Sequence, residues 1–347
     1  MLLSVKFTVM GSLNMDFVLS VPRLPQEGET LLAQNFSTFP GGKGANQAVA
    51  LARLGGQVNM IGAVGDDDLG NNLLRNLEQE QIDTTGVQCL ADTPTGNAFI
   101  TVDQQGKNTI LVYPGANGEL KTSWVPQHKE LIQNSEYLLM QLETPLEVVE
   151  ATAELADSLG TKVILNPAPG QELSQNLLKR VHLLTPNETE LSVISGMTTE
   201  TREEQIAAAR HLTDLGVDQV VVTLGSEGAF HVDKNMGQQG THGHHNTHCN
   251  HGTRGTYGTR GTHGTQDSQN PQEATFVDSF SVKAVDTTAA GDSFTAALAI
   301  ALGQGQSIEN ALKYASAVAA ITVTKEGAQS SLPYSHQVDT FLKKGEL

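Results

Sequence analysis

The stretch of sequence that decides the fold is Asp286-Thr-Thr-Ala-Ala-Gly-Asp-Ser-Phe294. It lies between an alternating, strand-like run (280–285) and a helix-like run of small residues that begins near Gly291. A tight turn of small residues between a strand and a helix directs free backbone N–H groups toward one point. The positive end of the helix dipole then favours an anion there, typically phosphate. Ala289 and Ala290, together with Gly291, leave room for a ligand to approach the backbone.

Asp292 lies beside this predicted anion site and has two interpretations. A carboxylate at the edge of a phosphate site can accept a proton from an attacking hydroxyl, which indicates phosphoryl transfer to an alcohol. Aspartate is also a common capping residue at helix N-termini, where its role is purely structural. Because short motifs occur by chance, the stretch alone leaves both interpretations open.

Composition narrows the class of protein. The chain has 347 residues, 38% of them hydrophobic, and a formal net charge of −17. This charge argues against nucleic acid or an anionic membrane as a partner, and no apolar run reaches the length of a membrane span. The first ten residues lack the pattern of a secretory signal, and the two cysteines, Cys89 and Cys249, are typical of a reducing compartment. We therefore expect a soluble, cytoplasmic protein.

Strand-like and helix-like runs alternate along most of the chain. The alternation predicts a mainly parallel sheet with helices on both faces. The predicted strands are 5–10, 58–64, 137–142, 162–165, 182–184, 220–224, 229–232 and 276–285, and the predicted helices are 69–79, 146–158, 203–215, 293–302 and 308–324. Short alternating runs within about 17–39 and 95–116 predict a smaller, four-stranded sheet that acts as a lid. The exposed edges of such a lid need covering, so we expect a homodimer through it.

Polar side chains follow two of the predicted strands. Asn14 and Asp16 come after the first strand in Gly11-Ser-Leu-Asn-Met-Asp16, and Glu143 follows the strand at 137–142. Ligands of an open parallel sheet bind at the carboxyl ends of its strands, and these side chains suit sugar hydroxyls. For Asn14 and Asp16 taken alone, an ordinary Asx turn is the simpler explanation.

A glycine loop opens an alanine-rich helix at Gly41-Gly-Lys-Gly-Ala-Asn-Gln-Ala-Val-Ala50, followed by Leu51-Ala-Arg-Leu-Gly55. It again directs N–H groups toward a ligand. It is not a Walker loop, because the four-residue spacer is missing and Gly44 follows the lysine where Ser or Thr is needed. A sugar-binding role therefore becomes the better interpretation.

Two further turns suit a nucleotide. In Thr185-Pro-Asn-Glu-Thr-Glu190, Asn187 and Glu190 lie three apart at a helix start, so both can face a hydrated Mg²⁺ between phosphates. A capping box explains the same spacing. The turn Gly225-Ser-Glu-Gly228 follows a strand and suits nucleotide phosphate or ribose. The loop Lys325-Glu-Gly-Ala-Gln-Ser-Ser331 is expected to pass near the anion site.

In combination, these motifs resemble the ribokinase family of carbohydrate kinases, which has the PfkB-type fold. The resemblance runs from about residue 5 to residue 341 and rests on the stretches 11–16, 41–55, 140–143, 187–190 and 286–294. It implies one kinase domain over 1–347, a three-layer α/β/α fold with a mainly parallel sheet and a small β-sheet lid. It also implies ATP-dependent phosphorylation of D-ribose at the 5-hydroxyl.

The resemblance assigns roles to individual residues. Asp292 is the base, beside an anion hole formed by Ala289, Ala290 and Gly291. The residues implied to bind the sugar are Asn14, Asp16, Gly42, Lys43, Asn46 and Glu143. Those implied to contact ATP are Asn187, Thr223, Gly225, Ser226, Gly228, Gly291 and Ser316, and Asn187 and Glu190 also support Mg²⁺ indirectly. A K⁺ site is implied at Asp286, Thr288, Thr322, Lys325, Gly327 and Ser331. Ser316 departs from the His or Asn that is common in the family beside the base.

Two alternatives to ribose phosphorylation remain at this stage. The first is a kinase of another sugar, such as deoxyribose or fructose, or of a nucleoside. Asp16, together with Asn14 and Lys43, favours a polyhydroxy pentose. The second is a non-catalytic, sugar-sensing protein, against which the intact Asp292 and Ala-Ala-Gly turn argue.

The segment 237–270 does not fit the family pattern. It contains the repeat Gly-Thr-Arg-Gly-Thr-Tyr-Gly-Thr-Arg-Gly-Thr-His-Gly-Thr and is too poor in apolar residues to offset the entropy of ordering it. We expect a disordered, dispensable, low-complexity insert between two strands. The alternative is a regulatory zinc site formed by His242, His244, His245, His248, Cys249 and His251.

Overall fold

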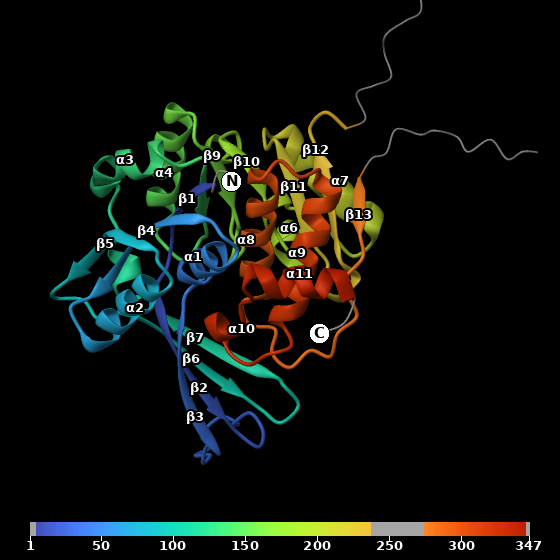
Figure 1. Cartoon of the computed structure of the whole chain (residues 1–347). Helices are drawn as coiled ribbons and strands as arrows, with labels where there is room; N and C mark the ends of the chain where they lie inside the picture. Colours follow the sequence, from blue (N-terminus) through green and yellow to red (C-terminus); the bar gives the residue numbers. More distant parts are fainter. Residues whose placement is uncertain (1–4, 237–273, 345–347) are drawn as a thin grey trace, which may run out of the picture.

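The structure, a computed structural model, describes residues 5–236 and 274–344. Its strands form two sheets, a large one that we call the body sheet and a small one that we call the lid (Figure 1). The body sheet has nine strands in the order β13-β12-β11-β10-β9-β8-β1-β4-β5. Their bounds are β1 (Lys6–Met10), β4 (Gln57–Gly65), β5 (Asp83–Leu90), β8 (Tyr137–Met140), β9 (Lys162–Leu165), β10 (Val181–Leu184), β11 (Gln219–Thr223), β12 (Ala229–Asp233) and β13 (Thr275–Val277).

The body sheet is parallel from β5 to β11, and β12 and β13 continue it in antiparallel fashion at one edge. This confirms the predicted, mainly parallel sheet. Strand β5 was not predicted, because its residues alternate between half-buried and exposed at the opposite edge. An edge strand of this kind lacks the continuous apolar run of a central parallel strand.

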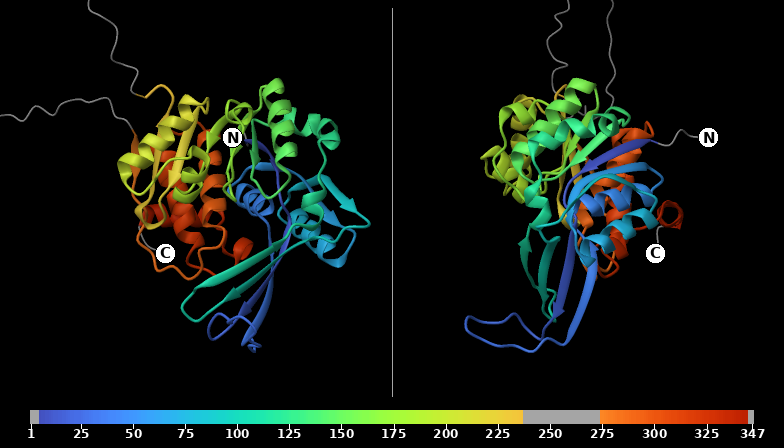
Figure 2. Two further views of the ribbon diagram at one scale, coloured as in Figure 1. Left: turned by 180° about the vertical axis from the view of Figure 1, so that it is seen from behind. Right: turned by 90° about the vertical axis from the view of Figure 1, so that its left-hand side faces the viewer.

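Helices cover both faces of the body sheet, so the fold has three layers (Figure 2). Side chains from neighbouring positions of one strand enter opposite cores: Val9 packs in one and Met10 in the other. The helices on the Val9 side are α1 (Lys43–Arg53), α2 (Asp68–Gln79), α8 (Ala290–Gly303), α9 (Ile308–Thr322) and α11 (Ser335–Lys344). Those on the Met10 side include α3 (Lys129–Gln133), α4 (Leu146–Leu159), α5 (Gln175–Leu178), α6 (Glu188–Ser195) and α7 (Arg202–Asp214).

The lid is a four-stranded sheet that projects from the body (Figure 1). Its order is β3-β2-β6-β7, with β3 (Asn35–Gly41), β2 (Asn14–Ser20), β6 (Gly96–Val102) and β7 (Asn108–Tyr113). The hairpin predicted around 103–106 is present between β6 and β7. The lid strands therefore come from the two segments predicted for them.

The strand predicted at 276–285 is largely wrong. Strand β13 ends at Val277, and the chain to Thr288 forms no further strand. Phe280 and Val282 pack partly against the core on the Val9 side, and Ser279, Phe280, Ser281, Val282 and Ala284 line a cavity. At its end the segment turns to helix α9, where the N–H groups of Val285 and Asp286 donate to the carbonyl of Val323. An alternating pattern of apolar residues therefore does not by itself establish a sheet partner.

The predictions for the insert at 237–270, including its candidate zinc ligands, lie outside the described residues. Within the described ranges, no helix is both long and apolar enough to cross a membrane. The same ranges contain no group of three or more His, Cys, Asp or Glu side chains arranged to hold a metal ion.

Candidate active site

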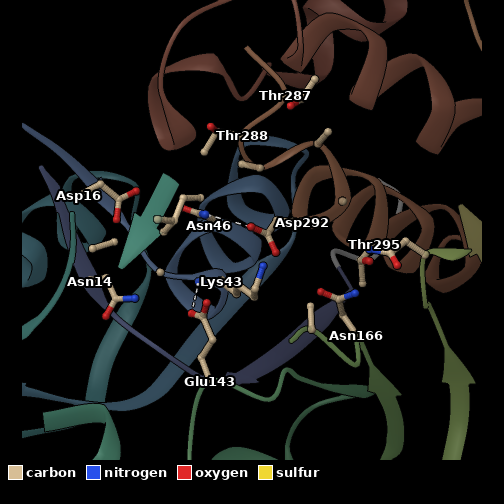
Figure 3. Close-up of a pocket in the computed structure, with 18 of the residues that line it drawn as sticks. Asn14, Asp16, Lys43, Asn46, Glu143, Asn166, Thr287, Thr288, Asp292 and Thr295 are labelled. Carbon is tan, nitrogen blue, oxygen red and sulfur yellow. Dashed lines mark hydrogen bonds between the residues drawn. The ribbon is translucent and has the colours of Figure 1, made fainter. Parts of the chain in front are cut away.

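A cavity of about 350 Å³ lies where the lid meets the carboxyl ends of the body strands (Figure 3). It brings together side chains that are far apart in the sequence. From the body and the glycine loop it receives Gly42, Lys43, Asn46, Glu143, Asn166, Asn187, Glu190 and Asp292, and from the lid strands Asn14, Asp16, Ala98, Ile100, Asn108, Ile110 and Val112. All six residues implied to bind a sugar therefore line one cavity.

Asn14 and Asp16 lie on strand β2 and not in an Asx turn. Asn14 is oriented by Asn117, whose Nδ2 donates to Asn14 Oδ1 at 2.8 Å. The same Asn117 amide also bonds the backbone N–H and carbonyl of Leu13. Because Asn14 Oδ1 is occupied, its Nδ2 is the group left to donate to a ligand.

The glycine loop is held close to the end of β1. Gly42 has φ +87°, and a Cβ there would overlap the backbone of Ser12 and Asn14, so only glycine fits. Glu143 connects the loop to strand β8, since its Oε2 accepts from Ser12 Oγ at 2.6 Å and from the Lys43 N–H at 3.3 Å. The loop thereby places the Lys43 side chain beside Asp292 (Figure 3).

Asp292 does not cap helix α8. The N-cap position is Ala289, without a side-chain cap, and Asp292 lies in the first turn. Its two oxygens accept from the glycine-loop helix instead: Asn46 Nδ2 donates to Oδ2 at 3.0 Å, and Gln47 Nε2 donates to Oδ1 at 3.1 Å. Asp292 is 5% exposed. The interpretation of Asp292 as a helix cap is therefore wrong.

The start of helix α8 has the geometry of an anion site. Ala289 has φ +60°, a conformation that costs energy for a residue with a Cβ. This turn directs the first N–H groups of the helix outward, and those of Gly291 and Asp292 have no helical acceptor four residues back. A Cβ at Gly291 would meet no atom within 4 Å, so the ligand side of the turn is open.

Charges are concentrated in the cavity. Burial raises the pKa of Asp16 to about 7, and the nearby Glu143 and Asp292 carboxylates add to this while Lys43 opposes it. Burial opposes the charge of Lys43, but Asp292, Glu143, Glu190 and Asp16 together raise its pKa above the ordinary value. Burial likewise raises the pKa of Glu190. Lys43 is therefore the local counterion of several carboxylates.

A second cavity, of about 500 Å³, adjoins the first. Thr223, Thr287, Ala290 and Gly291 line both, so the two meet at the start of helix α8. The second cavity is also lined by the remaining residues implied to contact a nucleotide, which are Gly225, Ser226, Gly228 and Ser316. Its other wall is mostly apolar and consists of Phe280, Val282, Ala284, Phe294, Ala319, Ala320 and Val323.

Asn187 and Glu190 line the first cavity and also form the capping box that the sequence allowed. Glu190 N–H donates to Asn187 Oδ1 at 2.8 Å, and Asn187 N–H donates to Glu190 Oε2 at 2.9 Å. The two interpretations are compatible, because the box uses only Oε2 of Glu190, and the same residue lines the cavity.

The residues implied to hold K⁺ come from two loops, 286–288 and 325–327, and from the last residues of helices α9 (Thr322) and α10 (Ala328–Ser331). Asp286 Oδ1 accepts from the N–H and hydroxyl of Thr288, and its Oδ2 accepts from the Gly327 N–H at 2.9 Å. Thr322 and Ser331 are fully buried, each with its hydroxyl bonded to a helix carbonyl. Lys325 lies in the same loop as Gly327, and its N–H donates to the Thr322 carbonyl at 3.3 Å. The donors are predominantly oxygens, which fits a hard cation.

Sequence reasoning missed several residues of the site. Gln47 contacts Asp292 directly, and Asn166 lies at the end of β9 and lines the cavity. The rule that ligands meet strand ends, which identified Glu143, would have identified Asn166 as well. Thr185 and Thr295 form a buried hydroxyl pair, 3.0 Å apart, beside the cavity. These two residues are 110 positions apart, so no local sequence pattern links them.

Comparisons with known proteins agree with this geometry. The model of the pfkB family of carbohydrate kinases matches residues 5–249 and 246–334. The chain is 39% identical to a ribokinase from Haemophilus influenzae, over 97% of this chain and 98% of the relative. It is 35% identical to a deoxyribokinase from Salmonella typhi, over 97% and 99%. The structure of Arabidopsis thaliana ribokinase with ribose and ATP matches with a TM-score of 0.81 and 31% identity, over 98% and 99%.

The fold and site thus define an α/β kinase that acts on a small alcohol. More specifically, the chain belongs to the pfkB family of carbohydrate kinases.

Proposed function

We propose that this protein transfers the γ-phosphate of ATP to the 5-hydroxyl of D-ribose, giving ribose 5-phosphate. The observation that carries the proposal is that two cavities, one polar and one mostly apolar, meet at the start of helix α8 beside Asp292. The polar cavity suits a sugar and the apolar one an adenine base. The relatives that bear the name ribokinase, and the Arabidopsis structure with ribose and ATP, support the pairing of substrates.

Asp292 is the base in this proposal. Its carboxylate accepts the proton of the attacking hydroxyl as the new O–P bond forms and the bond to the ADP oxygen breaks. The N–H groups of Gly291 and Asp292, at the positive end of helix α8, stabilise the charge on the transferring phosphoryl group. The Lys43 ammonium adds a positive charge near Asp292.

The sugar is held by groups from both sheets. Asn14 Nδ2 and Lys43 donate to its hydroxyls, and Asp16, Glu143 and the unpartnered, buried Asn46 Oδ1 accept from them. A site built to bond a hydroxyl can reject an analogue that lacks it by about 10⁴–10⁵-fold. This dense set of polar groups supports ribose over deoxyribose, although a deoxyribokinase is among the relatives.

Two cations complete the proposed reaction. Glu190 and Asn187 are suited to hold a hydrated Mg²⁺, which neutralises phosphate charge. The oxygen donors around Asp286 suit K⁺, because the Asp286–Gly327 bond already brings the two loops together next to the turn at Ala289. We expect the cation to fix this turn, so that activity is higher in K⁺ than in a bulky organic cation at the same ionic strength.

We also propose a homodimer formed through the lid. One face of β6 and β7 lines the sugar cavity with Ile100, Ile110 and Val112. On the other face of the lid, Phe36 from β3, Phe99 from β6, and Leu111 and Tyr113 from β7 are each at least 48% exposed, around a stack formed by Phe17 with Phe36 and Phe99. A contiguous apolar face of this kind marks an interaction site, and a second copy offers the same face. The low cysteine content supports a cytoplasmic location.

The test is an ATP-consumption assay with D-ribose, 2-deoxyribose, fructose and adenosine, each in K⁺ and in tetramethylammonium. We expect ribose in K⁺ to give the highest kcat/KM. A higher value for deoxyribose would reassign the substrate, and no sugar-dependent turnover with any acceptor would refute the proposed function.

A further inference from the structure

A chain of buried amides is bonded to Asp292; Gln47 and Gln141 in this chain do not line the cavity, whereas Asn166 does. Gln47 is 0% exposed and does not line the cavity, whereas its neighbour Asn46 does. Gln47 Nε2 donates to Asp292 Oδ1 at 3.1 Å and to Asn166 Oδ1 at 3.2 Å. Gln47 Oε1 in turn accepts from Gln141 Nε2 at 2.6 Å.

The direction of every amide in this chain is determined by its ends. An ionised carboxylate and a backbone carbonyl can only accept hydrogen bonds. Asn166 Nδ2 donates to the Thr185 carbonyl at 2.9 Å, which leaves Asn166 Oδ1 to accept from Gln47. Gln47 must then present Nε2 to both Asn166 and Asp292, so its Oε1 is free only for Gln141.

The chain retains one unfavourable feature. Gln141 Oε1 is buried and has no hydrogen-bond partner in the described part of the structure. Leaving a buried acceptor unpaired costs about 1–3 kcal/mol. Gly11 makes room for this group, because a Cβ there would overlap Gln141 Oε1. Unpaired groups of this kind are more easily explained at a functional site than by packing.

We propose that Gln47 is a positioning residue for phosphoryl transfer and that Gln141 fixes its direction. Gln47 holds Asp292 Oδ1 from the buried side, so that Oδ2, bonded only to Asn46, is presented to the sugar hydroxyl. An amide donor also stabilises the ionised form of the carboxylate, which is the form that accepts the proton. This inference rests on the proposed role of Asp292 as base.

Other charges also act on Asp292. Asp16 faces it from β2, Glu190 from helix α6 and Lys43 from helix α1, and Glu143 lies near Lys43 from the end of β8. None of these groups bonds Asp292 directly in the described contacts, whereas Asn46 and Gln47 do. A change at Gln47 therefore removes a direct donor and leaves the surrounding charges in place.

The experiment compares Gln47→Met, Gln47→Glu and Gln141→Met with a matched control, Gln205→Met. Gln205 is also a buried glutamine, but it lies on helix α7. Its Nε2 donates to the Glu188 carboxylate and to the Thr199 carbonyl, in the same way that Gln47 Nε2 donates to two oxygens. Each variant is assayed with ribose and ATP, and its melting temperature is measured.

For Gln47→Met we expect kcat to fall about 10–100-fold, because a misplaced catalytic group costs up to about 100-fold. KM for ribose should change by less than about threefold. Gln47→Glu keeps the shape but places a like charge beside Asp292, so its kcat should fall further. Gln141→Met should lower kcat less than Gln47→Met does, and Gln205→Met should leave kcat unchanged.

Equal kcat values in all variants, or a loss confined to KM, would overturn the inference. A carboxyl-¹³C aspartate NMR spectrum at one pH reads the direct bond without turnover, with the Asp292 signal identified by its loss in Asp292→Asn. This signal should shift in Gln47→Met and stay in place in Gln205→Met, and a signal that is unchanged in Gln47→Met would contradict the inference. If the wild type phosphorylates no sugar, the proposed function fails, and the spectrum still decides whether Gln47 acts on Asp292.

Discussion

The two sheets of this protein differ in how much of each is buried. In the body sheet, strand β8 is buried at every position, and helices cover both faces. In the lid, strand β7 is exposed at every position. Burial of apolar side chains stabilises by roughly 25 cal/mol per Å². The body sheet therefore forms a core with its own helices, whereas the lid depends on the ligand beneath it and on a partner at its outer face. We therefore expect the body to fix the reacting groups and the lid to adjust around the substrate.

The first test of this comparison is Asp292→Asn, at the start of a body helix. Because a positioned base contributes typically 10²–10⁴-fold, we expect kcat to fall in that range. The protein should keep its circular dichroism spectrum and dimer size, since the body core is untouched. A kcat within tenfold of the wild type would remove Asp292 from the chemistry and would weaken the claim that the body fixes the reacting groups.

The second test is Asp16→Asn, on the lid strand that enters the body. Hydrogen bonds to a charged group contribute about 1.5–3 kcal/mol, so KM for ribose should rise about 10–100-fold with little change in kcat. The control is Asp103→Asn, which removes a carboxylate from the exposed turn between β6 and β7. Equal effects of the two variants would show that Asp16 does not contact the sugar.

The third test is Leu111→Glu, on the outer face of the lid, where this side chain is 68% exposed. Two buried charges at a self-complementary contact should convert the dimer to a monomer in light scattering. Val193→Glu, on the exposed face of helix α6, is the control and should leave the mass unchanged. We also expect a higher KM for ribose in the monomer, because the lid then lacks its cover. A wild type that is already monomeric would refute the proposed interface.

The fourth test uses pH and has the smallest expected effect. Burial raises the pKa of Asp16 from its ordinary 3.8 to about 7. The ligand-free folded protein thus keeps a proton that the unfolded chain releases, and the associated stability is complete below about pH 4 and lost as pH rises through about 7. Asp16→Asn has no such loss. Its melting temperature relative to the wild type should therefore increase between pH 4 and 8, by on the order of 5 °C. A difference that is independent of pH would contradict the assignment.

Local patterns in the sequence were sufficient where one segment carries the whole signal. The apolar run before Glu143 predicted a buried strand, which the structure shows as β8, and Glu143 lines the first cavity. The turn at Ala289 to Gly291 predicted a helix start, and helix α8 begins there. The alternation at 280–285 was misread, because local periodicity does not identify the partner of an extended segment.

By itself, the sequence determined the strand–helix alternation, the lid segments and the identity of the polar groups at each strand end. Only the tertiary structure decided that Asp292 bonds Gln47 and Asn46, about 245 positions earlier in the chain, and so does not cap its own helix. It also decided that Asn117 orients Asn14 and that the two cavities meet at helix α8. The physical reason is that secondary structure follows from short-range periodicity, whereas the partner of a buried polar group is chosen by which strand ends the parallel sheet brings to one edge.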